Sequence, residues 1–336
     1  MAVSLLEFIV GLAIVAATLH DVFVTVVSPG ASTGLLQLAR RVRRSTLPLL
    51  RRRRGRSHRP GRGYGPFLLI ASFVLWMLLL HLGFGLMAHA VAPDFEGEPM
   101  TFPEALYLMG SSLVTIGLSG VDAEGAARWL VLAAGICGLG VITMTITYLL
   151  TIQQMLHQRE TRLLTLSVEA GQPPSGADLL ETYGRMNAPE GLAELFRDWR
   201  DWSAELLHSH TAHPALAFYR TTDAGPNWAD ALEAVLDAAT VTMALVDAEA
   251  EVVAAATLAH RMGSRAAAHL CALFDFRTAP DDDGSWSSET AARLRERLEE
   301  AGFAVRQGSQ TGDRLAALRQ DYLPHTTLLR AHFGAA

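Results

Sequence analysis

The chain has 336 residues, half of them hydrophobic, with a positive mean hydropathy and a formal net charge of −6. So apolar a composition argues against an ordinary soluble protein and points to membrane-spanning helices. The apolar residues concentrate before about residue 155, whereas most acidic residues follow it. Cys137 and Cys271 lie far apart in different surroundings, so the sequence indicates neither a disulfide framework nor a cysteine-based metal site.

The first apolar run, residues 5–27, is long enough to cross a bilayer as a helix. A secretory signal peptide is the alternative, but the run is too long and lacks a basic start and a small-residue cleavage site. Ionisable side chains are costly in lipid and usually face protein. Because Glu7, His20 and Asp21 belong to this segment, we expect the N-terminal helix unit, residues 1–30, to pack against other spanning helices.

A basic linker follows at residues 31–66, with 11 arginines and no acidic residue between positions 40 and 62. Its first part could form an amphipathic helix on the membrane surface, and nucleic-acid binding is the other interpretation of such a run. An arginine-rich loop between spanning segments is more often a topology signal. We therefore expect no nucleic-acid partner, a cytoplasmic linker and an N-terminus outside the cell.

Two further apolar runs predict spanning helices at residues 67–92 and 127–155. With the linker inside, the first of them runs outward and the second runs inward. The chain between them therefore starts and ends at the outer face. Together these elements form a predicted pore domain at residues 67–159.

The segment between these helices predicts a short helix at residues 102–114. Thr101 is a suitable N-cap, Pro103 lies in the first turn and Glu104 is the third helical residue. At 1.5 Å per residue this helix is about 20 Å long, too short for a hydrocarbon core of about 30 Å. The segment must enter the membrane and return, which is tolerated only where it lines a cavity or is buried in protein.

The residues that follow the short helix are Thr115, Ile116, Gly117, Leu118 and Ser119. Extended backbone there could turn its carbonyl groups towards an axis, where four copies would replace the water shell of a monovalent cation. The spacing from Ala-Leu-Tyr at 105–107 to Thr-Ile-Gly resembles the pore helix and filter of potassium channels, whose filter pattern is Thr-Val-Gly-Tyr-Gly. The resemblance extends to bacterial channels with an additional N-terminal helix and a helical C-terminal domain.

This resemblance implies a homotetrameric cation channel in a bacterial inner membrane, with K⁺ as the expected permeant ion and no cofactor. Leu118 replaces the family's aromatic residue, Ser119 its second glycine and Gly120 its aspartate. Filter glycines relieve steric strain where successive carbonyls face the axis, so the choice between K⁺ and Na⁺ stays open. Inner helices of the family often carry a hinge glycine, for which the candidates are Gly135, Gly138 and Gly140.

Acidic residues flank the short helix and the residues after it, namely Asp94, Glu96, Glu98, Asp122 and Glu124. Repeated around a fourfold axis, they would raise the local cation concentration at the outer mouth. Short outer loops are often simply polar, so that interpretation stays open as well.

Residues 160–336 carry apolar residues at three- and four-residue spacing and predict a mostly helical cytoplasmic domain. Residues 241–247 are the one run that could form a strand. Because the domain continues directly from the inner helix, it could assemble the tetramer, gate the inner helices or bind a regulator that the sequence does not identify. His208, His210 and His213 are weak candidates for a divalent metal site, and a polar helix end is the commoner explanation.

The sequence thus predicts an all-α membrane protein with a pore-loop channel domain and a mostly helical cytoplasmic domain. It carries no nucleotide-binding, nucleophile-elbow or zinc-protease motif in a suitable context, so we expect no enzymatic activity. The alternative is a membrane-anchored signalling or metal-binding helical protein without a conducting pore. Assembly distinguishes the two, because a pore loop requires subunits around one axis.

Overall fold

The computed structural model describes most of the chain, namely residues 2–26, 64–92, 100–117, 123–219, 227–276, 286, 288–306 and 310–333. Every regular element within these residues is a helix, and an isolated antiparallel β-bridge joins Val246 and Val305. The expected all-α architecture is confirmed. The possible strand at 241–247 is wrong, because its first four residues end helix α8 (Trp228–Ala244).

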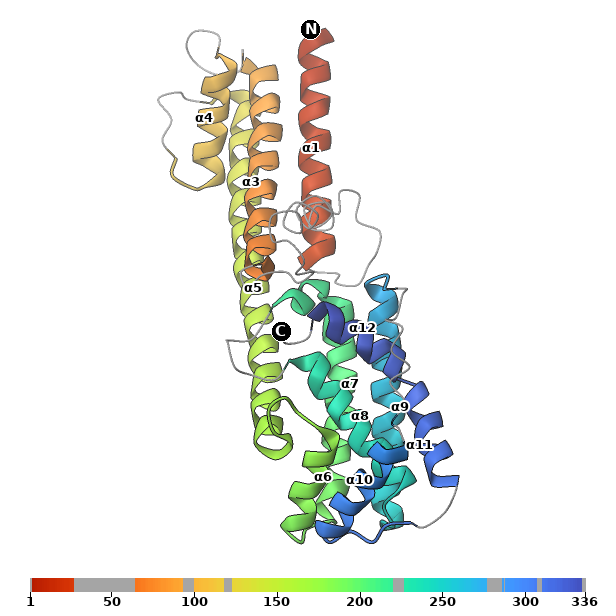
Figure 1. Cartoon of the computed structure of the whole chain (residues 1–336). Coiled ribbons are helices and arrows are strands. Elements are labelled where there is room, and N and C mark those ends of the chain that lie inside the picture. Colours follow the sequence, from red (N-terminus) through yellow and green to blue (C-terminus); the bar gives the residue numbers. More distant parts are fainter. Residues whose placement is uncertain are drawn as a thin grey trace. The chain divides into compact units, whose positions relative to one another are not determined.

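The chain divides into two compact units, Met1–Gln154 and Met155–Ala336, which are described separately (Figure 1). Among the described residues of the first unit, three helices are long and apolar enough to cross a membrane. They are α1 (Ala2–Val26), α3 (Tyr64–Ala90) and α5 (Gly125–Ala170). Between α3 and α5 the chain forms the short helix α4 (Phe102–Leu113).

Helix α5 is longer than the predicted 127–155, since it continues to Ala170. The prediction ended the helix where its apolar run ended, but nothing in the following residues breaks a helix. The helix stops where Gly171 takes a left-handed conformation (φ 76°) two residues before Pro173. The end predicted at residue 155 was therefore wrong.

Helices α1 and α3 pack antiparallel and are joined by polar pairs near both ends. The indole N–H of Trp76 donates to Asp21 (2.9 Å), and His89 is hydrogen-bonded to Glu7 (2.8 Å). The expected packing of the N-terminal helix on a spanning helix is confirmed, with Glu7 and Asp21 in contact with α3 and His20 exposed in the single chain. The antiparallel packing puts the N-terminus of α1 beside the C-terminal end of α3.

The second unit contains the end of α5 and a set of shorter helices. They are α6 (Gly176–Arg185), α7 (Gly191–Ala212), the 3₁₀ helix η2 (Pro214–Phe218), α8, α9 (Ala250–Leu273), α10 (Ser288–Glu300), α11 (Gln310–Gln320) and α12 (Leu323–Phe333). Helix α8 is buried along nearly its whole length, and α6, α9, α11 and α12 pack around it. Several aromatic side chains are buried in this core, among them Trp199, Trp202, Phe218, Tyr219 and Trp228.

Candidate functional site

The short helix α4 begins at the cap that the sequence predicts. The backbone N–H of Thr101 donates to the carboxylate of Glu104 (2.7 Å), and Pro103 occupies the first turn. The helix has 12 residues and is therefore about 18 Å long. It is too short to cross a bilayer, so it can only enter the apolar layer and leave it on the same side.

One face of α4 packs on α3 through small residues. A Cβ atom at Gly110 would lie 2.6 Å from the His81 ring, and one at Gly85 of α3 would lie 2.5 Å from the Leu106 side chain. The buried apolar residues of α4 belong to the core of the first unit, and these are Ala105, Leu108, Met109 and Leu113. This packing fixes the direction in which α4 points.

Helix α5 meets the C-terminal end of α4 at Gly138. A Cβ atom there would lie 1.9 Å from the carbonyl oxygen of Leu113, which only a glycine avoids. At Gly135 the nearest atom would be 3.5 Å away, and at Gly140 nothing lies within 4 Å. The three hinge candidates thus differ: α5 is helical through all of them, and Gly138 is a close packing contact. Their role in gating stays a prediction.

The chain leaves α4 in a tight turn rather than in extended backbone. Thr115 is left-handed (φ 59°), and its N–H donates to the Ser112 carbonyl (3.0 Å), while the Ile116 N–H donates to the Ser111 carbonyl (2.9 Å). This is a Schellman motif, with threonine where glycine is usual. The expected extended conformation is therefore wrong at Thr115, because the turn satisfies carbonyl groups at the end of α4. Gly117 is also left-handed (φ 71°).

The structure describes three of the five filter candidates. Thr115, Ile116 and Gly117 lie together after α4, and all three are exposed in the single chain. Leu118 and Ser119 lie outside the described residues, as do the acidic candidates Asp94, Glu96, Glu98 and Asp122. The remaining acidic candidate, Glu124, is exposed just before α5 begins.

Large apolar side chains are exposed beside these residues and along α5. Ile116 is 62% exposed and Tyr107 of α4 is 63% exposed. On α5 the corresponding residues include Trp129, Leu132, Ile136 and Leu139. An apolar surface of this extent needs lipid or other protein to cover it.

The three histidines do not form a metal site. His208 is exposed, while His210 and His213 are buried, and no group of at least three His, Cys, Asp or Glu residues in the described chain could hold a metal. The ring of His210 lies beside that of Trp228, with 5.1 Å between the centroids, and its Nδ1 is hydrogen-bonded to the Leu206 carbonyl. Burial, together with the charge of Arg159, lowers the pKa of His210 to about 3.

This burial predicts an acid-sensitive second unit. The pKa of His210 is about 3 in the fold and ordinarily 6.5, so the folded chain binds this proton less tightly than the unfolded chain. The corresponding stability is complete above the ordinary pKa and is lost as the pH falls towards the folded one, at up to about 1.4 kcal/mol per pH unit. We expect His210→Phe to lose less thermal stability than the wild type between about pH 7 and about pH 5.

Thermal unfolding of the detergent-solubilised protein, followed by intrinsic fluorescence, measures this difference. His208→Gln, which removes a nearby exposed histidine, should keep the acid sensitivity of the wild type. An equal fall in Tm for His210→Phe and the wild type would exclude His210 as the source.

A comparison with protein families adds one finding to this geometry. A family model described as "Ion channel" matches residues 68–154. This segment belongs to the ion channel family. It extends from α3 through α4 to the first unit's part of α5, so it contains the short helix and the residues after it. No curated protein and no solved structure matches the chain. The chain is thus a membrane protein with an ion-channel domain, in agreement with the resemblance.

Sequence reasoning missed the polar pairs between α1 and α3 and the packing role of Gly138. The polar pairs could have been predicted, because Glu7 and His89 lie at the same predicted depth of two antiparallel helices. No sequence signal marked Gly138 as the packing contact, because Gly135, Gly138 and Gly140 lie close together in the same apolar helix.

Proposed function

We propose that the chain is one subunit of a homotetrameric channel for monovalent cations, with four copies of residues 115–119 as its filter. The observation that carries this proposal is the capped helix α4, which is too short to span, belongs to the family-matched segment and leads directly into exposed Thr-Ile-Gly. Its C-terminal end carries partial negative charge, which favours a cation. The expected absence of enzymatic activity agrees with a family of channels.

Assembly around an axis accounts for the exposed side chains. Tyr107, Ile116 and the outward face of α5 are apolar, and neighbouring subunits would cover part of this surface. A filter needs the same carbonyl groups from several chains, so the turn at Thr115 would open when four copies meet. Native mass spectrometry of the detergent-solubilised protein should give four chains. A monomer or dimer that still conducts ions would contradict the filter.

K⁺ is the permeant ion that the Thr-Ile-Gly pattern favours, and Na⁺ is the alternative because of Leu118, Ser119 and Gly120. The topology follows from the arginine-rich linker, which puts the C-terminal domain in the cytoplasm of a bacterium and the N-terminus outside. Antiparallel packing of α1 on α3 is compatible with this topology.

The C-terminal domain gates the inner helix through Arg159 in this proposal. Arg159 lies on α5, is buried, and donates to the carbonyl oxygens of Leu216 (3.2 Å) and Tyr219 (2.9 Å). Burying a guanidinium against neutral carbonyls costs free energy. In this proposal the contact transmits movement between the domain and α5. It ties the end of α5 to η2.

Arg159→Met should therefore change the open probability in the same direction as deletion of residues 175–336. Single-channel recording in planar bilayers measures both. Arg162→Met is the matched control, because Arg162 pairs with Asp198 (3.3 Å) through half-exposed side chains and contributes little. Gating that neither the deletion nor Arg159→Met alters would exclude a regulatory role of the domain.

A further inference from the structure

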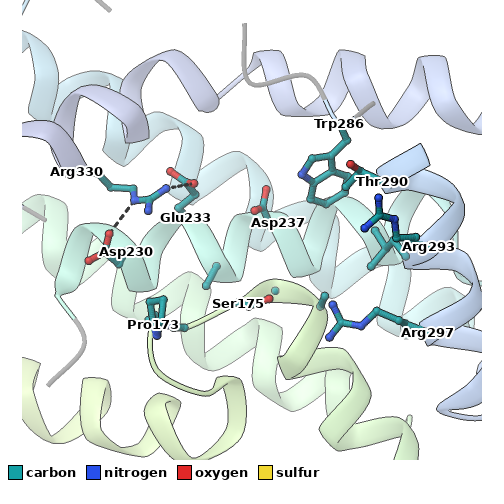
Figure 2. Close-up of a pocket in the computed structure, with 15 residues that line it drawn as sticks. Pro173, Ser175, Asp230, Glu233, Asp237, Trp286, Thr290, Arg293, Arg297 and Arg330 are labelled. Atoms are coloured by element: carbon teal, nitrogen blue, oxygen red, sulfur yellow. Dashed lines mark hydrogen bonds and ion pairs between the residues drawn. The ribbon is translucent and has the colours of Figure 1, made fainter. Parts of the chain in front are cut away.

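The second unit contains a cavity of about 430 Å³ that is lined by residues of that unit alone. It lies between the start of α6, helix α8, helix α10 and Arg330 of α12 (Figure 2). Cavities that hold small molecules usually have volumes of about 300–1,000 Å³. The volume thus suits a ligand of modest size.

One wall of the cavity is a row of three carboxylates on α8. Asp230, Glu233 and Asp237 are three and four residues apart, which puts them on one face of the helix. Arg330 donates to Asp230 (2.7 Å) and to Glu233 (2.6 Å), and Arg319 donates to Asp237 (3.1 Å). Three carboxylates thus face two guanidinium groups, and the excess charge of this wall is negative.

Burial makes this excess charge costly. It raises the pKa of both the Glu233 and Asp237 carboxyl groups, although the neighbouring arginines oppose the shift. A cationic group that entered the cavity would stabilise the charged forms of both. The α8 wall is therefore suited to an ammonium group.

The other wall presents hydrogen-bond donors. Arg293 and Arg297 lie one turn apart on α10. Figure 2 shows both arginines on the same side of the cavity, away from Arg330. This wall is suited to an anionic group.

Arg293 is the arginine of this wall that is most available to a ligand. Arg297 is held by Asp178 and Glu181. Arg293 instead pairs with Glu289 on its own helix, through side chains that are 69% and 75% exposed. Such an exposed pair contributes little, so a ligand can replace it at small cost.

An ion-pair network that only fastens helices together is the alternative explanation. It accounts for Arg319 and Arg330, which join α11 and α12 to α8. It does not account for Arg293, whose partner lies on the same helix. Trp286 and Leu294 also line the cavity and offer apolar contact between the two walls.

We propose that this cavity binds a small zwitterion of extended shape, with its ammonium group at the α8 carboxylates and its carboxylate at Arg293. The proposal concerns binding alone and holds whether or not the domain gates the channel.

The test uses three compounds with the same six-carbon chain: 6-aminohexanoate, hexanoate and hexylammonium. Each is titrated calorimetrically into the full-length protein in lipid nanodiscs. We expect 6-aminohexanoate to bind at least about tenfold more tightly than either compound with a single charge. Its affinity should rise with pH, because burial raises the pKa of the Glu233 and Asp237 carboxyl groups and the ammonium group binds their ionised forms.

Two variants locate the site. Arg293→Gln should weaken 6-aminohexanoate about tenfold, and Ala177→Trp should abolish binding by filling the cavity. Arg265→Gln on the exposed side of α9 removes the same charge elsewhere and should leave binding unchanged. Absence of 6-aminohexanoate binding to the wild type, equal binding of hexanoate or hexylammonium, or binding that Arg293→Gln and Ala177→Trp do not alter would overturn the proposal. The readout is binding, so its failure leaves the proposed channel untouched.

Discussion

Replacing Gly138 by alanine is expected to reduce ion flux at least about tenfold. The added Cβ atom would lie 1.9 Å from the Leu113 carbonyl oxygen and 2.7 Å from its carbonyl carbon. Both are backbone atoms at the end of α4, so no side-chain rotation can relieve the overlap. Either α5 or the end of α4 must move, and residues 115–117 follow α4 directly. Overpacking of this kind typically costs about 1–3 kcal/mol, and here it acts next to the proposed filter.

Flux through proteoliposomes measures this effect, with Gly140→Ala as the matched control. Gly140 lies two residues along the same helix, where a Cβ atom would meet nothing within 4 Å. Alanine also favours a helix by about 1 kcal/mol over glycine, so both variants change helix propensity alike. Flux that is equal in the two variants would show that the contact with Leu113 does not position the filter.

The second large effect is expected at Gly117. This residue is left-handed (φ 71°), a conformation that costs an ordinary residue about 1–2 kcal/mol. Gly117→Ala should therefore impair the filter backbone and reduce both flux and the preference between K⁺ and Na⁺. We expect the variant to fold and assemble, because a Cβ atom there would meet nothing within 4 Å in the single chain.

Gly125→Ala separates backbone strain from the effect on the pore. Gly125 also has a positive φ (51°) and open space around its Cβ position, but it lies at the start of α5. Both substitutions carry the same kind of backbone strain, but Gly125 lies outside residues 115–119. Gly125→Ala should therefore retain nearly normal flux. Equal loss of flux in both variants would attribute the effect to stability rather than to the filter.

The sequence predicted those elements whose signals are local. The cap of α4 is contained in Thr101, Pro103 and Glu104, so the beginning of the short helix was predicted correctly. The C-terminal end of α5 was predicted too early. The apolar run indicates only which residues can lie in lipid, whereas the helix itself ends at Gly171, shortly before Pro173.

Features that depend on distant contacts could not be predicted. The turn at Thr115 is local but was also missed, because threonine occupies the left-handed position where glycine is the usual signal. The cavity of the second unit joins α6, α8, α10 and α12, and only the spacing of the carboxylates on α8 is visible in the sequence. A single helix face of acidic residues is usually solvated, so that spacing alone predicts no binding site.

The most direct measurement of the central claim is the flux of K⁺ and of Na⁺ into proteoliposomes, for the wild type and for Gly117→Asp. Channel function with a filter at residues 115–119 predicts cation flux through the wild type, with K⁺ faster than or equal to Na⁺. It predicts loss of that flux in Gly117→Asp, because four carboxylates near the axis would trap cations and distort the backbone. Flux of the same size in both proteins, or no flux of either ion through an assembled wild-type protein, would contradict the filter.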